Sequence, residues 1–385
     1  MRTRQRVLVV LAILAGITGG VAALTATNME SKGPLSSLME RSASAVGAIE
    51  NAVRRSIMGS GRSSALAWFE PNRERVEFLK SPDRILFGAY DGGIPQTLDG
   101  VIELEQSVNT VFPMVHFYAA WGDKPDQQFP LQLSNAIWDL GSVPVITWEP
   151  WLDDFESAAH PNLPLRGKRD AHGLGAVATG AYDFYIDKWA TAAAAFDRPI
   201  YLRFAHEMND PYRYPWGPQN NSKEEYIAAW RHVVDRFRSA GANKVIWVWA
   251  PHVAYAYWDL YYPADQYADW IGTGALNYGP IAYWSKWWRF DEIFGQKYPR
   301  MAEFGKPIMI AEFGSLAVGG DRAEWYRSAL DDVATQEPLV KAVLFFNKRD
   351  DHTVTSQRID WTFAADTVVA STVAAGVSKL GAIRY

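Results

Sequence analysis

Eight short apolar runs, rich in β-branched and aromatic residues, recur along the chain between residues 85 and 350. Runs of this length and composition predict β-strands, and the stretches between them carry helical patterning. Strands that are apolar on both faces and alternate with helices are typical of a parallel sheet covered by helices. The predicted strands are residues 85–90, 110–118, 143–150, 199–207, 245–252, 271–279, 307–315 and 342–350.

The number of repeating units indicates the architecture within the α/β class. Eight strand and helix units in about 300 residues predict a closed (β/α)₈ barrel, also called a TIM barrel. An open doubly wound sheet is the alternative, and we favour it less because no glycine-rich nucleotide loop follows the first run. The predicted helices include residues 97–108, 181–196, 321–335 and 222–241, the last with a capping box formed by Ser222 and Glu225.

The N-terminal part of the chain has a different pattern. Three arginines within residues 1–6 precede an uncharged apolar segment, Val7–Leu24. Eighteen helical residues span roughly 27 Å, close to the thickness of a bilayer, so residues 1–26 are predicted to be a signal peptide or a membrane anchor. Both alternatives place the remainder outside the cytoplasm, secreted or held at the membrane through residues 7–24. Residues 27–82 are polar and serine-rich and predict a linker, which leaves residues 83–385 for the barrel.

Composition excludes several classes of function. The net charge is −5 with both signs interspersed, so the chain has no basic stripe for nucleic acid. It contains no cysteine, which excludes disulfides, thiolate metal sites and cysteine nucleophiles. Aromatic residues make up 14% of the chain, and large rings serve as core filling or as flat platforms for ligands. We expect a monomer with neither a cofactor nor a metal ion.

The active site of a (β/α)₈ barrel forms where the strands end, so the residues at those ends carry the functional signal. Two of them are carboxylates behind long apolar runs, Glu207 on the fourth predicted strand and Glu312 on the seventh. These strands lie nearly opposite each other in an eight-stranded ring. Facing carboxylates suit hydrolysis of a glycosidic bond, in which one protonates the leaving oxygen and the other attacks or directs water. The other polar or aromatic residues at strand ends are Tyr90, Asp91, His116, Tyr118, Trp148, Glu149, His206, His252, Asn277, Tyr278, Asn347 and Lys348.

Two other kinds of active site fit the sequence less well. His206 and Glu207 begin like a zinc-protease helix, but that motif needs a second histidine where the chain has Asp210. No G-x-S-x-G motif is present for a serine nucleophile. Sugars stack on aromatic rings, and the rings placed just past strand ends are Trp148, Trp216, Tyr278 and Trp284.

With "RFAHEMN", "NYG" and "AEFGS" in this order, residues 83–365 resemble glycoside hydrolase family 26. This family of retaining (β/α)₈ enzymes includes endo-β-mannanases and mixed-linkage β-glucanases. The resemblance implies that Glu207 is the acid/base and Glu312 the nucleophile, with His206 and Tyr278 holding the sugar and the nucleophile in place. The chain departs from the family pattern after HEMN, where relatives have glycine and this chain has Asp210. Its "YRYPWG" also has one residue more, so Tyr212 or Tyr214 is expected to replace a tryptophan ring.

The predicted function is therefore a retaining endo-β-glycanase that cleaves β-1,4 bonds in a β-mannan or a β-1,3-1,4-glucan. The style of the motif favours the β-glucan branch, and Arg203 is expected to keep Glu312 ionised. A non-catalytic glycan-binding or scaffold protein of an exopolysaccharide synthesis or export system is the alternative. The predicted substrate-binding residues are His206, Tyr278, Arg203, Trp216, Tyr212, Tyr214, Trp148, Glu149, His116, Trp284 and Asn347.

Overall fold

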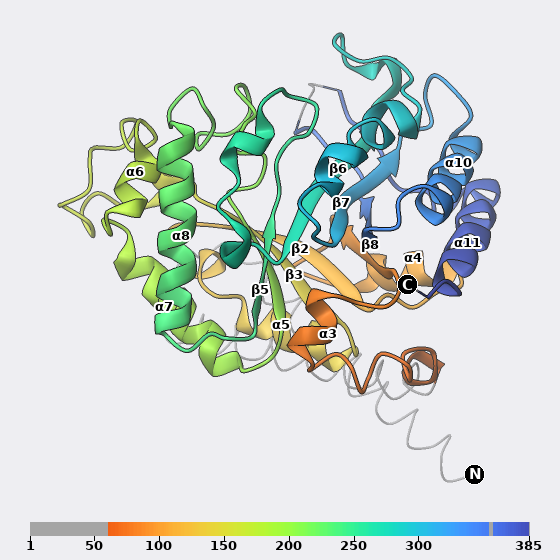
Figure 1. Cartoon of the computed structure of the whole chain (residues 1–385), viewed down its shortest axis with the longest axis horizontal. Helices are drawn as coiled ribbons and strands as arrows, with labels where there is room; N and C mark the ends of the chain where they lie inside the picture. Colours follow the sequence, from red (N-terminus) through yellow and green to blue (C-terminus); the bar gives the residue numbers. More distant parts are fainter. Residues whose placement is uncertain (1–60, 354–356, 385) are drawn as a thin grey trace, which may run out of the picture. The chain divides into compact units, whose positions relative to one another are not determined.

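Eight parallel strands close into a barrel in which each strand pairs with the next one along the chain and β8 pairs with β1 (Figure 1). This arrangement confirms the (β/α)₈ prediction and excludes the open sheet. The strands are β1 Leu86–Asp91, β2 Met114–Ala120, β3 Val143–Glu149, β4 Ile200–Phe204, β5 Val245–Trp249, β6 Trp270–Asn277, β7 Ile308–Ser315 and β8 Val340–Asn347.

The computed structural model describes residues 61–353 and 357–384. The predicted signal or anchor of residues 1–26 and the linker up to residue 60 lie outside the described residues. Within the described part of the chain, no helix combines the length and the apolar character needed to cross a membrane.

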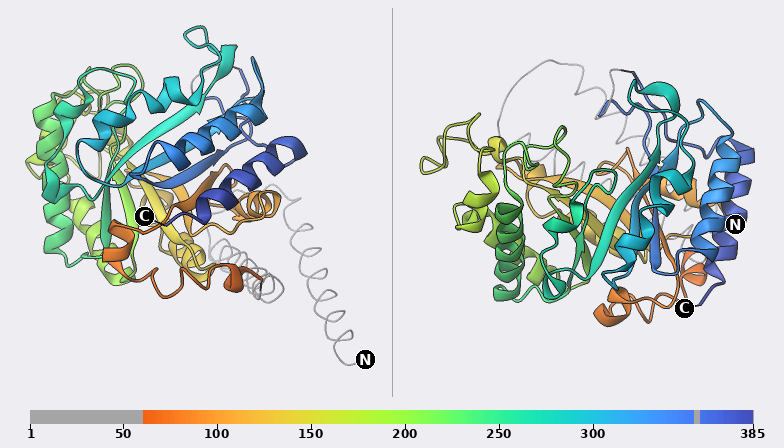
Figure 2. Two further views of the ribbon diagram at one scale, coloured as in Figure 1. Left: turned by 45° about the vertical axis from the view of Figure 1, so that its right-hand side comes forward. Right: turned by 45° about the horizontal axis from the view of Figure 1, so that its top comes forward.

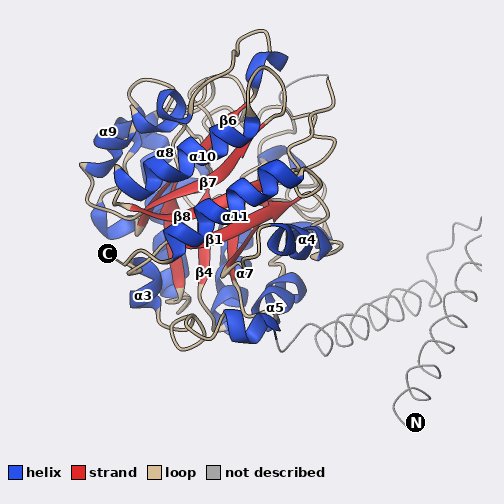
Figure 3. Cartoon of the chain, turned by 90° about the vertical axis from the view of Figure 1, so that its right-hand side faces the viewer, coloured by secondary structure: helices blue, strands red, loops and turns tan. Residues whose placement is uncertain are grey.

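The helices lie outside the strands, as two further views show (Figure 2). Figure 3 shows α10 over β7 with α11 beside it. The predicted capping box is confirmed, because the Ser222 hydroxyl accepts from the Glu225 N–H at the start of α8. The helices are α3 Val76–Lys80, α4 Asp99–Ser107, α5 Leu131–Asp139, α6 Gly173–Ala178, α7 Asp183–Phe196, α8 Lys223–Ser239, α9 Tyr298–Ala302, α10 Arg322–Thr335 and α11 Thr367–Gly381. Single helical turns are Pro125–Gln127, Leu152–Asp154, Trp258–Tyr261, Asp265–Tyr267, Gly279–Ile281 and Asp291–Gly295.

The fourth strand is shorter than predicted. It ends at Phe204 because Ala205 and Glu207 have φ angles of 43° and 52°, in the left-handed region that a strand cannot contain. The residues "AHEM" therefore form a turn beyond the strand. This turn places Glu207 three residues after the end of β4.

Residues 61–82 differ from the prediction of a polar linker that extends to residue 82. Phe69 and Leu79 are fully buried in the main hydrophobic core. The Leu79 carbonyl accepts from the Tyr201 hydroxyl at 2.8 Å and from the Trp270 indole N–H at 3.0 Å. Both donors stand at the beginnings of β4 and β6, so this segment covers the N-terminal end of the barrel. The prediction failed because the segment contains many charged residues and only a few apolar ones, and those few anchor it to the core.

We predict that Phe69→Ala lowers the free energy of unfolding by about 3 to 5 kcal/mol, because it removes a fully buried ring from a packed core. Chemical denaturation of the full chain measures the change. Leu165→Ala is the control, since Leu165 is 73% exposed and its loss should leave the stability nearly unchanged. Equal stability of the two variants would mean that residues 61–82 are not part of the folded domain.

Candidate active site

A buried ion pair joins opposite walls of the barrel. The Arg203 guanidinium on β4 donates through Nη2 to Oε1 of Glu312, the fifth residue of β7. The Arg203 side chain is 2% exposed and that of Glu312 is 12% exposed. A charge-assisted hydrogen bond at this depth is strong, and it fixes the position of the Glu312 carboxylate. The expected pairing of Arg203 with Glu312 is confirmed.

The electrostatic environment favours the ionised form of Glu312. Burial by itself raises the pKa of this carboxyl group, but the charge of Arg203 and its hydrogen bond outweigh burial. A hydrogen bond from Tyr118 and the charge of Arg213 act in the same direction, so the pKa of Glu312 is lowered. A buried carboxylate that stays negative is suited to act as a nucleophile.

Glu207 stands on the turn that follows β4, and its backbone is held from both neighbouring strands. The Glu207 N–H donates to the Ala250 carbonyl beyond β5 at 2.7 Å. The Ala205 N–H donates to the Trp148 carbonyl on β3 at 3.0 Å. These bonds hold two non-glycine residues in the left-handed region, a strain that is common where a side chain must be aimed for function. Glu207 is 9% exposed.

Two cationic or titratable side chains approach the Glu207 carboxylate from different sides. Arg213 Nη1 lies 3.4 Å from Oε2, and His252 Nε2 lies 4.0 Å from Oε1. The Arg213 guanidinium also lies over the Tyr214 ring, 5.1 Å from its centre. Arg213 was absent from the predicted site, although it lies in "YRYPWG", the segment where the chain departs from the family pattern.

His206, Tyr214 and Glu149 form a polar group beside the two catalytic candidates. His206 Nε2 shares a hydrogen bond with the Tyr214 hydroxyl at 3.0 Å, and its Nδ1 lies 4.0 Å from Glu149 Oε1. Burial, reinforced by the charge of Arg203, lowers the pKa of His206 well below its usual value, so the ring is neutral. Burial also raises the pKa of Glu149 to about 7, although the Trp151 indole donates to it at 3.0 Å.

An aromatic wall follows β6. Tyr278 is half-buried and meets Trp284 and Trp361 edge to face, with ring centres 5.3 Å and 4.9 Å apart. Burial raises the pKa of Tyr278, the charge of Arg213 lowers it, and the charges of Glu312 and Glu207 raise it further. Trp361 was missed, because it follows the eighth strand by fourteen residues and no pattern in the sequence connects it with Tyr278.

The site therefore combines an ionised carboxylate on β7, a second carboxylate after β4 and aromatic rings around them. Glycosidic bond cleavage uses such a pair. A model of the glycosyl hydrolase family 26 matches residues 178–328, a range that contains both Glu207 and Glu312. The barrel belongs to glycosyl hydrolase family 26.

Comparison with individual proteins supports the family 26 membership. Endoglucanase H of Acetivibrio thermocellus is 32% identical over 280 residues, which cover 70% of this chain and 29% of that protein. Mannan endo-1,4-beta-mannosidase A and B of Caldalkalibacillus mannanilyticus is 27% identical over 122 residues, covering 30% of this chain and 21% of the relative. The structure of GH26C from Muricauda sp. MAR_2010_75 shares the fold, with a TM-score of 0.59 at 16% identity over 82% of this chain and 89% of that one. This chain thus spans less than a third of the length of Endoglucanase H and of the mannan endo-1,4-beta-mannosidase.

Two of the predicted sugar-binding tryptophans in the family 26 barrel are core residues instead. Trp148 is fully buried and points outward from β3 into the helix layer, where it packs against Trp121 and Trp189 at 4.6 and 4.7 Å. Trp216 is 2% exposed, stacks behind Tyr214 at 4.6 Å and donates to the His206 carbonyl at 2.7 Å. The prediction was wrong because nearness to a strand end does not fix which way a side chain points.

His116 and Asn347 lie beneath the site rather than at its surface. His116 is fully buried inside the barrel, where its Nε2 shares a hydrogen bond with the Thr147 hydroxyl at 2.7 Å. Asn347 is 6% exposed and donates to Asp91 Oδ2 at 2.7 Å. The prediction that these two side chains contact a sugar directly is therefore wrong, and they support the site from below instead. Tyr212, in contrast, is 80% exposed.

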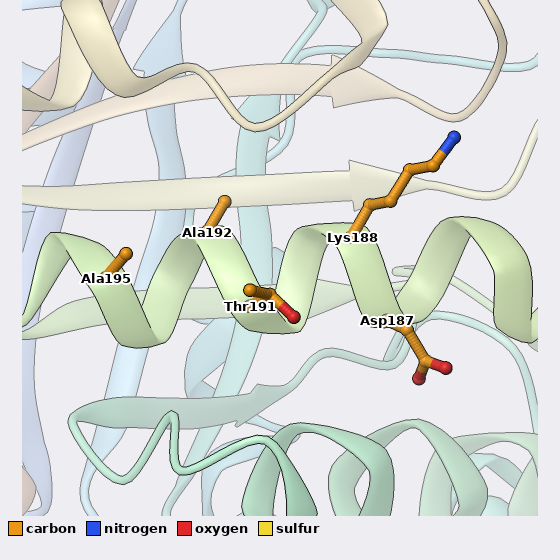
Figure 4. A pocket seen from close by; sticks show the side chains of 5 residues that line it. All are labelled: Asp187, Lys188, Thr191, Ala192 and Ala195. Atoms are coloured by element: carbon orange, nitrogen blue, oxygen red, sulfur yellow. The ribbon is translucent and has the colours of Figure 1, made fainter.

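A shallow cavity elsewhere on the molecule lies on the outer helix layer. Figure 4 shows that it follows one side of α7, where it is lined by Asp187, Lys188, Thr191, Ala192 and Ala195. None of these residues stands at the end of a strand. The cavity is thus separate from the carboxylate pair.

We predict that stability falls as pH rises through the range in which Glu149 titrates. Its pKa of about 7 exceeds the value near 4.3 of an unfolded chain, so the folded state holds the proton more tightly. The neutral form therefore stabilises the fold below about pH 4.3, and that contribution is lost by about pH 7. Glu149→Gln should make the fall in unfolding free energy between about pH 4 and pH 8 smaller by roughly 3 kcal/mol.

Chemical denaturation at a series of pH values measures this difference. The exposed Glu224→Gln serves as the control, because its side chain is 71% exposed and should leave the profile unchanged. An identical pH profile for Glu149→Gln and the unmodified chain would contradict a buried, proton-retaining Glu149.

Proposed function

We propose that the chain is a retaining endo-β-glycanase that cleaves β-1,4 bonds in a β-1,3-1,4-glucan, with β-mannan as the second candidate. The observation that carries the proposal is the Arg203–Glu312 ion pair, which keeps one carboxylate negative, while a second carboxylate stands on the turn after β4. The likeness to Endoglucanase H supports a glucan, and the shorter likeness to a mannan endo-1,4-beta-mannosidase supports the mannan alternative.

In the first step, an oxygen of Glu312 attacks the anomeric carbon of the bound sugar. The bond from that carbon to the leaving oxygen breaks, and Glu207 gives its proton to the leaving oxygen. The product is a covalent glycosyl-enzyme ester together with a shortened chain that carries a new hydroxyl group. Arg203 holds the attacking carboxylate in place throughout.

In the second step, water replaces the glycosyl ester. Glu207, now ionised, takes a proton from water, and the hydroxide attacks the same anomeric carbon and releases Glu312. Two inversions at one carbon retain the β configuration. Retention requires that the two carboxyl groups lie roughly 5 to 5.5 Å apart when substrate is bound. In this mechanism the hydroxyl of Tyr278 and the neutral imidazole of His206 orient the sugar and the nucleophile.

We predict that Glu207→Gln and Glu312→Ala each lower polysaccharide turnover by roughly 10²-fold or more, because each removes a group that bonds to a reacting atom. Release of reducing ends from lichenan, mannan, xylan and carboxymethyl-cellulose by the full chain measures turnover and also ranks the backbones. Glu303→Gln is the control and should keep the full rate, because Glu303 is an exposed carboxylate at the C-terminal end of α9. NMR of the first anomer released should show the β form.

Several outcomes would overturn the assignment. Undiminished turnover in either active-site variant would mean that the carboxylates do not perform the reaction. An α anomer released first would mean an inverting enzyme. Glycan binding by the unmodified chain without any release of reducing ends would identify a non-catalytic glycan-binding or scaffold protein.

We further predict that Trp284→Ala raises KM for the polysaccharide about tenfold with little change in kcat, because Trp284 offers a half-exposed ring beside Tyr278. The neighbouring Tyr283→Ala is the matched control, since Tyr283 is fully exposed to solvent. Initial rates over a range of substrate concentrations separate the two parameters. Equal KM values for the two variants would remove Trp284 from the binding surface.

We also propose that the chain works outside the cytoplasm, either secreted or anchored at the membrane. The arginine-led apolar segment Val7–Leu24 supports this location. Fractionation of cells that produce the full chain tests it, and recovery in the cytoplasm would refute it.

A further inference from the structure

The turn after β4 and the segment after β5 bring together three side chains that can bind a metal ion. They are Glu207, Asp210 and His252, and one ligand atom from each lies within 4.8 Å of the others. The Arg203–Glu312 ion pair does not take part in this group. The cluster therefore involves the proposed acid/base but leaves the proposed nucleophile aside.

Asp210 supplies the second observation. It is fully buried, and within the described part of the chain its Oδ2 has no hydrogen-bond partner. Its other oxygen accepts from the Tyr212 N–H at 2.8 Å. A buried carboxylate oxygen without a partner is costly unless a cation neutralises it. Asp210 is also the residue at which the chain leaves the family pattern. The unpartnered Oδ2 atom therefore belongs to a side chain that the family pattern, with glycine at this position, does not have.

The three side chains are attached to a well-fixed backbone. The Asp210 N–H donates to the Glu207 carbonyl at 2.9 Å. The Asn209 side chain accepts from the His252 N–H at 2.8 Å and donates to the His252 carbonyl at 2.9 Å. These bonds tie the two segments together, so the cluster is preorganised rather than assembled from independent loops.

Two carboxylate oxygens and an imidazole nitrogen form a ligand set that suits zinc and related divalent ions. The Nε2 atom of His252 faces Glu207 Oε1 at 4.0 Å, while its Nδ1 has a long contact of 3.4 Å from the Ala254 N–H. The ligand atoms of a tetrahedral zinc ion lie ~2.0 to 2.2 Å from the metal and therefore about 3.4 Å from one another. Small side-chain rotations that move the ligand atoms by about 1 Å would bring these three residues to that separation. Arg213 lies against the opposite oxygen, Oε2.

We propose that Glu207, Asp210 and His252 form a binding site for a zinc-class divalent cation that switches off the acid/base. A cation held by Glu207 prevents that carboxyl group from carrying the proton for the leaving oxygen, and it prevents the later deprotonation of water. The cation is therefore an inhibitor and takes no part in the reaction. This regulatory consequence rests on the proposed glycanase function, whereas cation binding does not.

Isothermal titration of the metal-stripped full chain with zinc chloride tests the site directly. We expect one zinc ion per chain, and we expect Asp210→Asn to weaken the affinity by at least about tenfold. His252→Gln is a second variant with the same expected loss, which keeps the test decisive if one variant fails to fold. His160→Gln is the matched control, because His160 pairs with Asp123 at 2.8 Å on the surface and should leave the affinity unchanged.

Inhibition of polysaccharide hydrolysis gives the second readout. Zinc should inhibit the unmodified chain reversibly, with recovery on addition of EDTA, and Asp210→Asn should need at least about tenfold more zinc for the same fractional inhibition. Unchanged affinity in both Asp210→Asn and His252→Gln, or equal zinc sensitivity of Asp210→Asn and the unmodified chain, would overturn the proposal. Zinc binding without any glycanase activity would refute the proposed function and leave the metal site standing.

Discussion

The buried ion pair between Arg203 and Glu312 is the interaction on which the site depends. Burying either charge alone would cost several kcal/mol, and the pair is tolerated because each ion compensates the other through a direct hydrogen bond. The two residues are 109 positions apart in sequence and belong to β4 and β7. They can meet only because the sheet closes into a barrel. Closure of the barrel and ionisation of the proposed nucleophile are therefore linked.

The turn after β4 is the second constraint, because it fixes the position of the proposed acid/base Glu207 relative to the barrel. Ala205 and Glu207 stand in left-handed backbone conformations that cost free energy. The N–H groups of Ala205 and Glu207 donate to the Trp148 carbonyl on β3 and to the Ala250 carbonyl just beyond β5, and these bonds offset the cost. Because the turn is held by its neighbours, the Glu207 carboxylate is fixed without being part of the regular sheet. The same turn carries Asp210 into the proposed cation site.

The strand pattern predicted the fold well because a parallel barrel needs eight runs that are apolar on both faces, and each run is visible locally. Side-chain direction was predicted less well. Trp148 and Glu149 are adjacent at the end of β3, yet one points into the helix layer and the other into the site. The burial of Phe69 and Leu79 also escaped prediction, because isolated apolar residues in a polar segment show no periodicity.

The sequence by itself determined the barrel, the order of its strands and the two candidate carboxylates, because these depend on periodicity and on short motifs. Glu207 lies just after the fourth strand and Glu312 lies within the seventh. Tertiary structure decided the rest. It paired Arg213 with Glu207, raised the pKa of Glu149 to about 7 by burial, and left one oxygen of Asp210 without a partner. Each of these properties depends on distances and burial between segments far apart in the chain, and only the closed fold sets them.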